Sequence, residues 1–231
     1  MSDQNVFPEV AENVRRILYE IGEAEQKYRG TSGNVRLMAV TKTVPPEAVN
    51  AAVEAGVGLL GENRVQEYLG KKELYSPKAE VHFIGSLQTN KVKYIIDSVS
   101  LIHSADSVKL CSEINRLSGA DNRVTDVLVE INIGNEMSKG GIAPEALNGF
   151  LDEISGFQNI RVKGLMTIPP PEESERCFEK MQRIFEDSRS RYKNMDILSM
   201  GMSADYITAV KYGSGIVRIG TGIFGARKYN I

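Results

Sequence analysis

The sequence alternates between short apolar runs and amphipathic helical stretches, and this alternation constrains the fold more than any other feature. Eight runs have the length and composition of buried strands: 37–42, 57–61, 81–85, 99–103, 127–133, 160–166, 196–200 and 215–219. A helical pattern follows each of the first seven, and a further amphipathic helix marked by residues 10–21 precedes the first strand. Parallel neighbours need a crossover connection, so strands separated by helices predict a parallel sheet.

Eight strand–helix units in one chain match a closed α/β barrel, the (β/α)8 TIM barrel, here with an extra N-terminal helix. An open doubly wound sheet is the alternative. The chain has 231 residues and no linker rich in Pro, Gly or Ser, so we predict a single domain over residues 1–231. In a barrel, the polar residues that follow the strands share one mouth. These residues are Lys42, Glu62, Asn63, Ser86, His103, Asn132, Thr167, Ser203, Gly220 and Thr221.

The composition argues against several classes of function. A formal net charge of −2 gives no basic bias for binding nucleic acid or an anionic membrane. No apolar run approaches the roughly 18 residues of a membrane span, and the first residues lack the basic and apolar regions of a signal peptide, so we expect a cytoplasmic protein. Cys111 and Cys177 have no metal-type spacing, and we expect both to face the core from helices.

Lys42 is the first candidate for chemistry because it ends the apolar run 37–41. Burying an ammonium group is costly unless the group is paired or loses its proton. A desolvated lysine becomes a nucleophilic amine, which is the form that makes Schiff bases with aldehydes. A solvated loop lysine is the alternative interpretation of this stretch alone.

The segment 215–225 carries the second candidate, a strand that delivers Arg218 and then a glycine-rich turn. Glycines such as Gly220 and Gly222 let backbone N–H groups approach an anion closely, and a following helical turn would aim its positive end there. Barrels often bind phosphate in the loops after strands seven and eight. Ser203, in the strand-seven loop, is a hydroxyl donor and the expected N-cap of the next helix. Taken alone, the glycine-rich loop is explained by a tight turn, and Ser203 by a helix cap. Because the two loops occupy the two places where barrels often bind phosphate, together they favour a phosphate site.

Six segments resemble a known family. They are AVTKT at 39–43, GENRVQE at 61–67, HFIGSLQTNK at 82–91, GLMTI at 164–168, MGMSAD at 200–205 and VRIGTGIFG at 217–225. In this order, and over residues 8–228, they resemble the pyridoxal-phosphate homeostasis family (the YggS/PROSC type). That family is similar to the barrel domain of alanine racemase. The resemblance implies pyridoxal 5'-phosphate as the cofactor and this barrel as the fold.

The resemblance also implies roles for individual residues. Lys42 falls on the lysine that forms the internal aldimine, and Arg218 falls on the arginine that faces the pyridine nitrogen. A permanently charged guanidinium there would keep the nitrogen unprotonated and weaken the ring as an electron sink. Asn63 falls near the ring. The implied phosphate cradle comprises Ser203, Gly220 and Thr221, and Met202 is implied as a further cofactor-binding residue.

Two further positions bear on the resemblance. Lys139 falls on a loop lysine at the mouth, with a solvated loop charge as the alternative. Val44 stands where the family often has a second lysine, so we do not expect a secondary cofactor lysine at that position.

Several polar residues are expected outside direct cofactor contact. We expect His82 at a strand start and His103 at a strand end, neither touching the cofactor. Glu62 is expected to be a solvated loop carboxylate, with orientation of Asn63 or Arg64 as the alternative.

Three functions follow from these residues. The first is a pyridoxal-phosphate-binding protein that holds the cofactor as a lysine aldimine and hands it to apoenzymes, with little or no turnover. The second is an amino-acid racemase, and the third is an aldolase that uses Lys42 on a sugar phosphate. The chain ends at Ile231, so we expect neither the β domain that supplies the racemase's tyrosine base nor its dimer contact. We therefore favour the first function, in a monomer.

Overall fold

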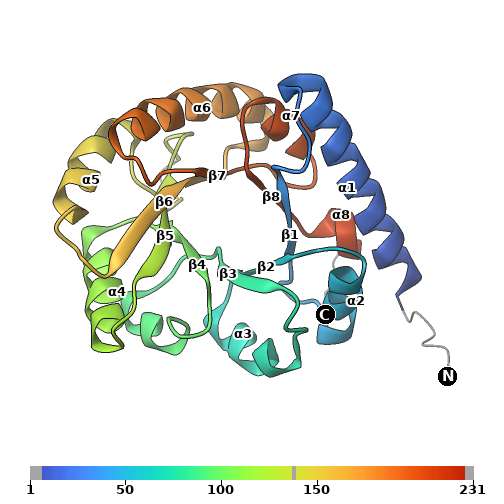
Figure 1. The fold of residues 1–231 in the computed structure, drawn as a ribbon, viewed down its shortest axis with the longest axis horizontal. Coiled ribbons are helices and arrows are strands. Elements are labelled where there is room, and N and C mark those ends of the chain that lie inside the picture. The colour runs from blue at the N-terminus through green and yellow to red at the C-terminus, as the bar shows by residue number, and fades with distance from the viewer. Residues whose placement is uncertain (1–6, 137–138, 227–231) are drawn as a thin grey trace.

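Eight parallel strands close into a barrel in sequence order in the computed structural model, which describes residues 7–136 and 139–226 (Figure 1). The strands are β1 (Arg36–Val40), β2 (Leu59–Glu62), β3 (Glu80–Phe83), β4 (Leu101–Ala105), β5 (Thr125–Ile131), β6 (Ile160–Thr167), β7 (Ile197–Ser199) and β8 (Ile216–Ile219). Pairing of β1 with both β2 and β8 closes the ring. The predicted (β/α)8 barrel is confirmed, and the open sheet is wrong.

Helices surround the barrel. The α-helices are α1 (Pro8–Arg29), α2 (Pro46–Glu54), α3 (Val65–Lys71), α4 (Val108–Ala120), α5 (Leu147–Ile154), α6 (Ser174–Arg191), α7 (Tyr206–Lys211) and α8 (Thr221–Phe224). The 3₁₀ helices are η1 (Lys72–Leu74), η2 (Thr89–Tyr94), η3 (Pro144–Ala146) and η4 (Pro171–Glu173). The helix that the sequence predicts after the third strand, over 90–96, is the 3₁₀ helix η2 rather than an α-helix; 3₁₀ geometry is common in connectors. Among the described residues, no helix has the length and apolarity to cross a membrane.

The predicted N-terminal helix is α1, which packs beside α7, α8 and α2 (Figure 1). Its buried residues Val14, Ile17 and Ile21 recur at helical spacing and face the same cluster as Leu37 and Val217. Burying each such side chain stabilises the fold by about 1.5–3 kcal/mol. The helix therefore supports the outside of β1, which leads to the predicted reactive Lys42, and of β8, which carries Arg218.

The carboxylate of Glu25, near the end of α1, fixes the entry to β1. It is almost fully buried and accepts backbone N–H bonds from Gly33, Asn34 and Val35. The helix itself ends at Gly30, whose left-handed backbone lets its N–H reach Gln26. These bonds determine where β1 starts.

The barrel interior is packed with side chains. Two apolar clusters fill it, and their buried members are Met38, Leu59, Ile84, Ile216, Leu101, Leu128 and Met166. Cys111 and Cys177 lie in the outer core, buried on α4 and α6, as the sequence predicts. His82 and His103 are also buried, with His82 Nδ1 3.0 Å from His103 Nε2. His103 lies within β4, so its predicted place at a strand end is wrong by two residues.

Candidate cofactor site

Lys42 lies at the C-terminal mouth of the barrel, two residues beyond the end of β1. Its side chain is half-buried, and within the described ranges its Nζ makes no hydrogen bond or ion pair. Lys71 lies near the same turn but is engaged: its Nζ is 2.5 Å from Glu67 Oε1 and 3.3 Å from the Thr41 carbonyl. Of these two amines, only Lys42 is available for a ligand.

Arg218 places a fixed cation inside the barrel. It is 3% exposed, and its guanidinium donates to Ser199 Oγ at 2.7 Å and to the Thr167 carbonyl at 2.9 Å. Burial lowers the pKa of Arg218 to about 10, and the carboxylates of Glu130 and Asp205 oppose that shift. The side chain is therefore charged at neutral pH and is anchored to both β6 and β7.

Glu130, near the end of β5, is a site residue that the sequence analysis missed. Burial raises its pKa to about 7; the nearby charge of Asp106 raises it further, while Arg218 opposes the rise. Asp126, Leu128 and Glu130 alternate along β5 with Val127, Val129 and Ile131, which pack in the outer core, so they share the opposite face. A charged residue in the middle of an apolar run was the signal that could have revealed it.

Ser203 joins the loops after β7 and β8. Its Oγ lies 3.1 Å from Thr221 Oγ1 and accepts the Gly222 N–H at 3.2 Å. The prediction that Ser203 caps the next helix is wrong, since α7 begins at Tyr206 with Asp205 at its N-cap position. The hydroxyl instead reaches the start of α8, the helical turn expected after the glycine-rich loop. The two loops together present two hydroxyls beside a helix start.

Glycine is required in this cradle for reasons of space. A Cβ on Gly222 would lie 2.9 Å from the Ile219 side chain, and one on Gly201 would lie 2.5 Å from the Ala209 Cβ. The Met202 N–H is already donated to Asp205 Oδ1 at 2.7 Å. The Gly220 carbonyl accepts from two α8 amides. Contacts of Met202 and Gly220 with a ligand therefore stay predictions.

Asn63 carries an unsatisfied acceptor next to the mouth. Its Oδ1 is buried and has no hydrogen-bond partner in the described part of the chain. Gly85 packs against the same residue so closely that a Cβ there would lie 2.1 Å from the Asn63 carbonyl. Buried acceptors are nearly always paired, so this amide is suited to a ligand that brings a donor.

Glu62 is not the solvated loop carboxylate that the sequence suggested. It is 0% exposed, and its Oε1 accepts from Thr41 Oγ1 at 2.6 Å and from the Tyr75 hydroxyl at 2.5 Å. Burial raises its pKa, against the effect of these two hydrogen bonds. Glu62 therefore belongs to the framework behind Lys42.

Other predicted residues at the mouth have structural partners. Lys139 is ion-paired with Glu136, and Asn132 bonds the backbone of Glu136 in the same loop. Thr167 donates to the Ile131 carbonyl. Val44 packs against the outer core. These contacts leave Lys42, Asn63, Ser203, Arg218 and Thr221 as the central group.

This group suits a small phosphorylated aldehyde. An unpartnered amine can take the aldehyde, the two hydroxyls of Ser203 and Thr221 can take the phosphate, and the orphaned Asn63 acceptor can take a ring substituent. No set of three or more His, Cys, Asp or Glu side chains within 7–136 and 139–226 is arranged to hold a metal ion.

Comparison with known proteins agrees with this arrangement. The family model for the N-terminal domain of alanine racemase matches residues 16–228. The chain belongs to this family. It is 42% identical to the pyridoxal phosphate homeostasis protein of Aquifex aeolicus over 224 residues, covering 94% of this chain and 98% of the relative. The protein of the same name from Escherichia coli (strain K12) is 36% identical over 230 residues, or 96% and 98% of the two chains. The family resemblance expected from the sequence is confirmed.

Solved structures share the barrel. PipY of Synechococcus elongatus, solved with PLP bound, has 31% identity and a TM-score of 0.76, over 89% of this chain and all of PipY. Alanine racemase from Corynebacterium glutamicum has 17% identity and a TM-score of 0.71, over 96% of this chain and 62% of the racemase. At this low identity, the similarity to alanine racemase shows the fold alone. PipY is a similar protein whose solved structure contains PLP.

Proposed function

We propose that this protein binds pyridoxal 5'-phosphate in the barrel mouth, holds it as an aldimine on Lys42 and serves intracellular pyridoxal-phosphate homeostasis as a carrier. The observation that carries the proposal is the unpartnered, half-buried Lys42 in the same mouth as the Ser203–Thr221 cradle and the Arg218 cation. The printed names of the Aquifex and Escherichia relatives and the PLP-bound PipY structure support the choice of cofactor.

Each residue has a definite task in this proposal. Ser203 Oγ would donate to the phosphate, and Thr221 Oγ1 and the Gly222 N–H would turn to it from Ser203 Oγ, which is their acceptor in this structure. Arg218, held by Ser199 and Thr167, directs a fixed positive charge at the ring nitrogen and disfavours its protonation. The bound cofactor would supply the aldehyde and an electron-withdrawing ring. Lys42 supplies the amine that retains or releases it.

We infer storage and delivery, with little or no turnover, as the main role. The chain matches the homeostasis relatives over 98% of their lengths but the racemase over only 62%. An amino-acid racemase is the second candidate, because the family model is the racemase barrel and Glu130, with a pKa of about 7, is a group able to exchange a proton near neutral pH. We further propose that the protein acts as a monomer in the cytoplasm.

One experiment separates the carrier from the racemase. Purified holo-protein is incubated with an apoenzyme that requires pyridoxal phosphate, and separately with D- and L-amino acids. We expect the apoenzyme to regain activity while optical inversion and keto-acid formation stay near background. Racemisation at about one turnover per second or faster, within the usual enzyme range, would overturn the carrier role. Light scattering of the same sample measures the molar mass in solution and so tests whether the protein is a monomer.

A further inference from the structure

We propose that Glu67 and Lys71 of α3, with Glu62 of β2, are positioning residues that clamp the turn carrying Lys42. None of these three residues is among the proposed cofactor contacts. They act instead on the backbone on either side of Lys42. The proposal rests on the proposed function only for the identity of the aldehyde that Lys42 receives.

Glu67 holds the residue after Lys42. Thr43 has a φ of +64°, a left-handed conformation that is uncommon for a β-branched residue. Its N–H donates to Glu67 Oε1 at 2.5 Å, and its hydroxyl donates to the Lys42 carbonyl at 2.6 Å. Thr43 is exposed, so packing does not impose this conformation. The Glu67 carboxylate is the group from outside the turn that fixes it.

Lys71 and Glu62 hold the residue before Lys42. Thr41 is fully buried, and its hydroxyl donates to Glu62 Oε1 at 2.6 Å. Its carbonyl accepts from Lys71 Nζ at 3.3 Å and from the Val44 N–H at 3.0 Å. The Tyr75 hydroxyl donates to the same Glu62 oxygen, so the anchor is itself fixed.

Glu67 and Lys71 also hold each other. They lie one turn apart on α3, their side chains are 17% and 16% exposed, and they form an ion pair at 2.5 Å. Partial burial would raise the pKa of Glu67, but the bonds from Lys71 and the Thr43 N–H hold it below its usual value. A single helical turn thus grips the backbone both before and after Lys42. These contacts also engage the Nζ of Lys71, the other amine near this turn.

Loss of the clamp should therefore impair capture of the aldehyde by Lys42 and spare phosphate recognition, which depends on loops across the mouth. The test measures Schiff-base formation with pyridoxal phosphate from its visible absorbance, as a rate and an equilibrium constant. Binding of pyridoxine phosphate, which keeps the phosphate but has no aldehyde, is measured by calorimetry. The variants are Glu67→Gln and Lys71→Met. The control is Glu73→Gln, which alters an exposed carboxylate in η1, the segment directly after α3.

For each clamp variant we expect the Schiff-base equilibrium constant to fall about tenfold or more, as for loss of a charge-assisted hydrogen bond. Pyridoxine phosphate affinity should stay within about twofold, and Glu73→Gln should match the wild type in both assays. A Schiff-base constant that is unchanged in both clamp variants would overturn the proposal. So would a parallel loss of pyridoxine phosphate binding, which would indicate general damage to the mouth.

Thr43→Gly gives a second test that does not depend on how well the single clamp variants fold. Glycine adopts a φ near +64° without strain, so the turn should depend less on Glu67. We expect Glu67→Gln to cost clearly less in the Thr43→Gly background than in the wild type, and equal costs would contradict the clamp. A wild-type protein that binds pyridoxine phosphate but never forms a Schiff base would refute the proposed function instead.

Discussion

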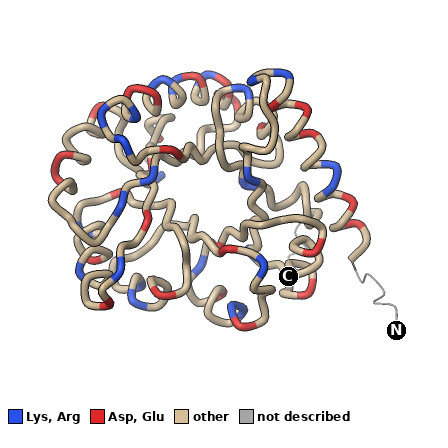
Figure 2. The backbone as a smooth tube through the Cα atoms, viewed as in Figure 1, with Lys and Arg blue, Asp and Glu red and all other residues tan. Residues whose placement is uncertain are grey.

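Polar side chains at the two ends of the barrel differ in how they are paired. At the N-terminal end, charged residues of the strands and the loop before β7 form three ion pairs: Arg36–Glu80, Asp126–Arg161 and Lys163–Asp196. At the mouth, Asn63 Oδ1 and Glu62 Oε2 are buried without partners in the described chain. Charges of both signs are also spread over the outer ring of helices (Figure 2). At the N-terminal end, the buried Arg123 Nε also lacks a hydrogen bond, but it lies 3.8 Å from Asp121 Oδ2. The comparison therefore shows charges paired with charges at this end, while the mouth keeps unpaired acceptors that a ligand could use.

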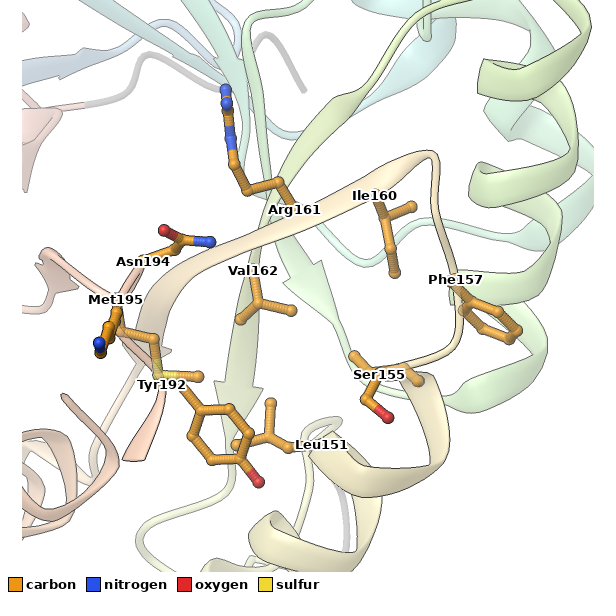
Figure 3. Close-up of a pocket in the computed structure, with 11 residues that line it drawn as sticks. Leu151, Ser155, Phe157, Ile160, Arg161, Val162, Tyr192, Asn194 and Met195 are labelled. Carbon is orange, nitrogen blue, oxygen red and sulfur yellow. The ribbon is translucent and has the colours of Figure 1, made fainter. Parts of the chain in front are cut away.

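A cavity also lies near the N-terminal end of the barrel. It measures about 320 Å³ and lies where α5 ends and β6 begins, with Leu151, Tyr192 and Met195 in its lining. The side chains of Arg161 and Val162 point to opposite sides of β6 (Figure 3). Arg161 Nε donates to Asp126 Oδ1 at 2.6 Å. None of the predicted site residues lines this cavity. Another cavity, of about 330 Å³, is lined in part by Asn63 and Ser86 at the mouth, so cavity volume does not distinguish the two ends of the barrel.

The largest expected effect comes from Arg218→Met, which removes the buried cation of the mouth. It leaves Ser199 Oγ and the Thr167 carbonyl without that donor, at a cost of about 1–3 kcal/mol for each unsatisfied group. We expect a lower free energy of unfolding in urea and weaker pyridoxal-phosphate binding. The comparison of the two ends would fail if Arg161→Met caused the same losses.

The next effect is a pH dependence that originates from Glu130. Its folded pKa of about 7 lies above the ordinary value of 4.5, so the folded apo-protein binds this proton more tightly than the unfolded chain. The contribution of Glu130 to stability is therefore present below about pH 4.5 and lost as the pH rises to about 7. The loss is on the order of 3 kcal/mol.

Glu130→Gln should remove this slope. Urea unfolding of both proteins between pH 5 and about pH 8 measures it. The difference between the two proteins isolates Glu130 from the buried histidines, which titrate in both. Parallel stability curves for the two proteins would show that Glu130 has no raised pKa.

A smaller effect is expected at the phosphate cradle. The wild type should bind pyridoxal phosphate two or more decades more tightly than pyridoxal, because several hydrogen bonds of about 1.5–3 kcal/mol reach a charged group. Ser203→Ala removes the hydroxyl shared by Thr221 and Gly222 and should shrink this ratio about tenfold or more. The control is Ser155→Ala, at an exposed serine that bonds only within its own turn. A ratio that Ser203→Ala leaves unchanged would remove Ser203 from the cradle.

The smallest effect belongs to the N-terminal end. Arg161 is 51% exposed, and its pair with Asp126 is expected to contribute at most about 1 kcal/mol. Arg161→Met should lower the unfolding midpoint slightly and leave cofactor affinity unchanged. A tenfold loss of affinity would mean that the two ends are coupled through the barrel core.

The sequence predicted the barrel because strand and helix periodicities depend on local residue order. It also placed Lys42 at the end of the first strand, although β1 ends two residues earlier, at Val40. Phosphate binding by the last two loops stays a prediction. It did not predict the burial of Glu62, since that depends on Tyr75 and Thr41 meeting around the carboxylate. Ser203 was taken for a local cap because its actual partners lie in another loop, 18 and 19 residues farther along the chain. Residue spacing carries no information on such contacts.

The most direct test of the central claim is to reduce the holo-protein with borohydride and map the pyridoxyl label by peptide mass spectrometry. Reduction converts a Schiff base into a stable amine, so the label marks the lysine that held the aldehyde. We expect the label on Lys42, with its loss and the loss of visible absorbance in Lys42→Ala. Label mainly on Lys71, Lys139 or another lysine, or full colour in Lys42→Ala, would contradict the proposed site.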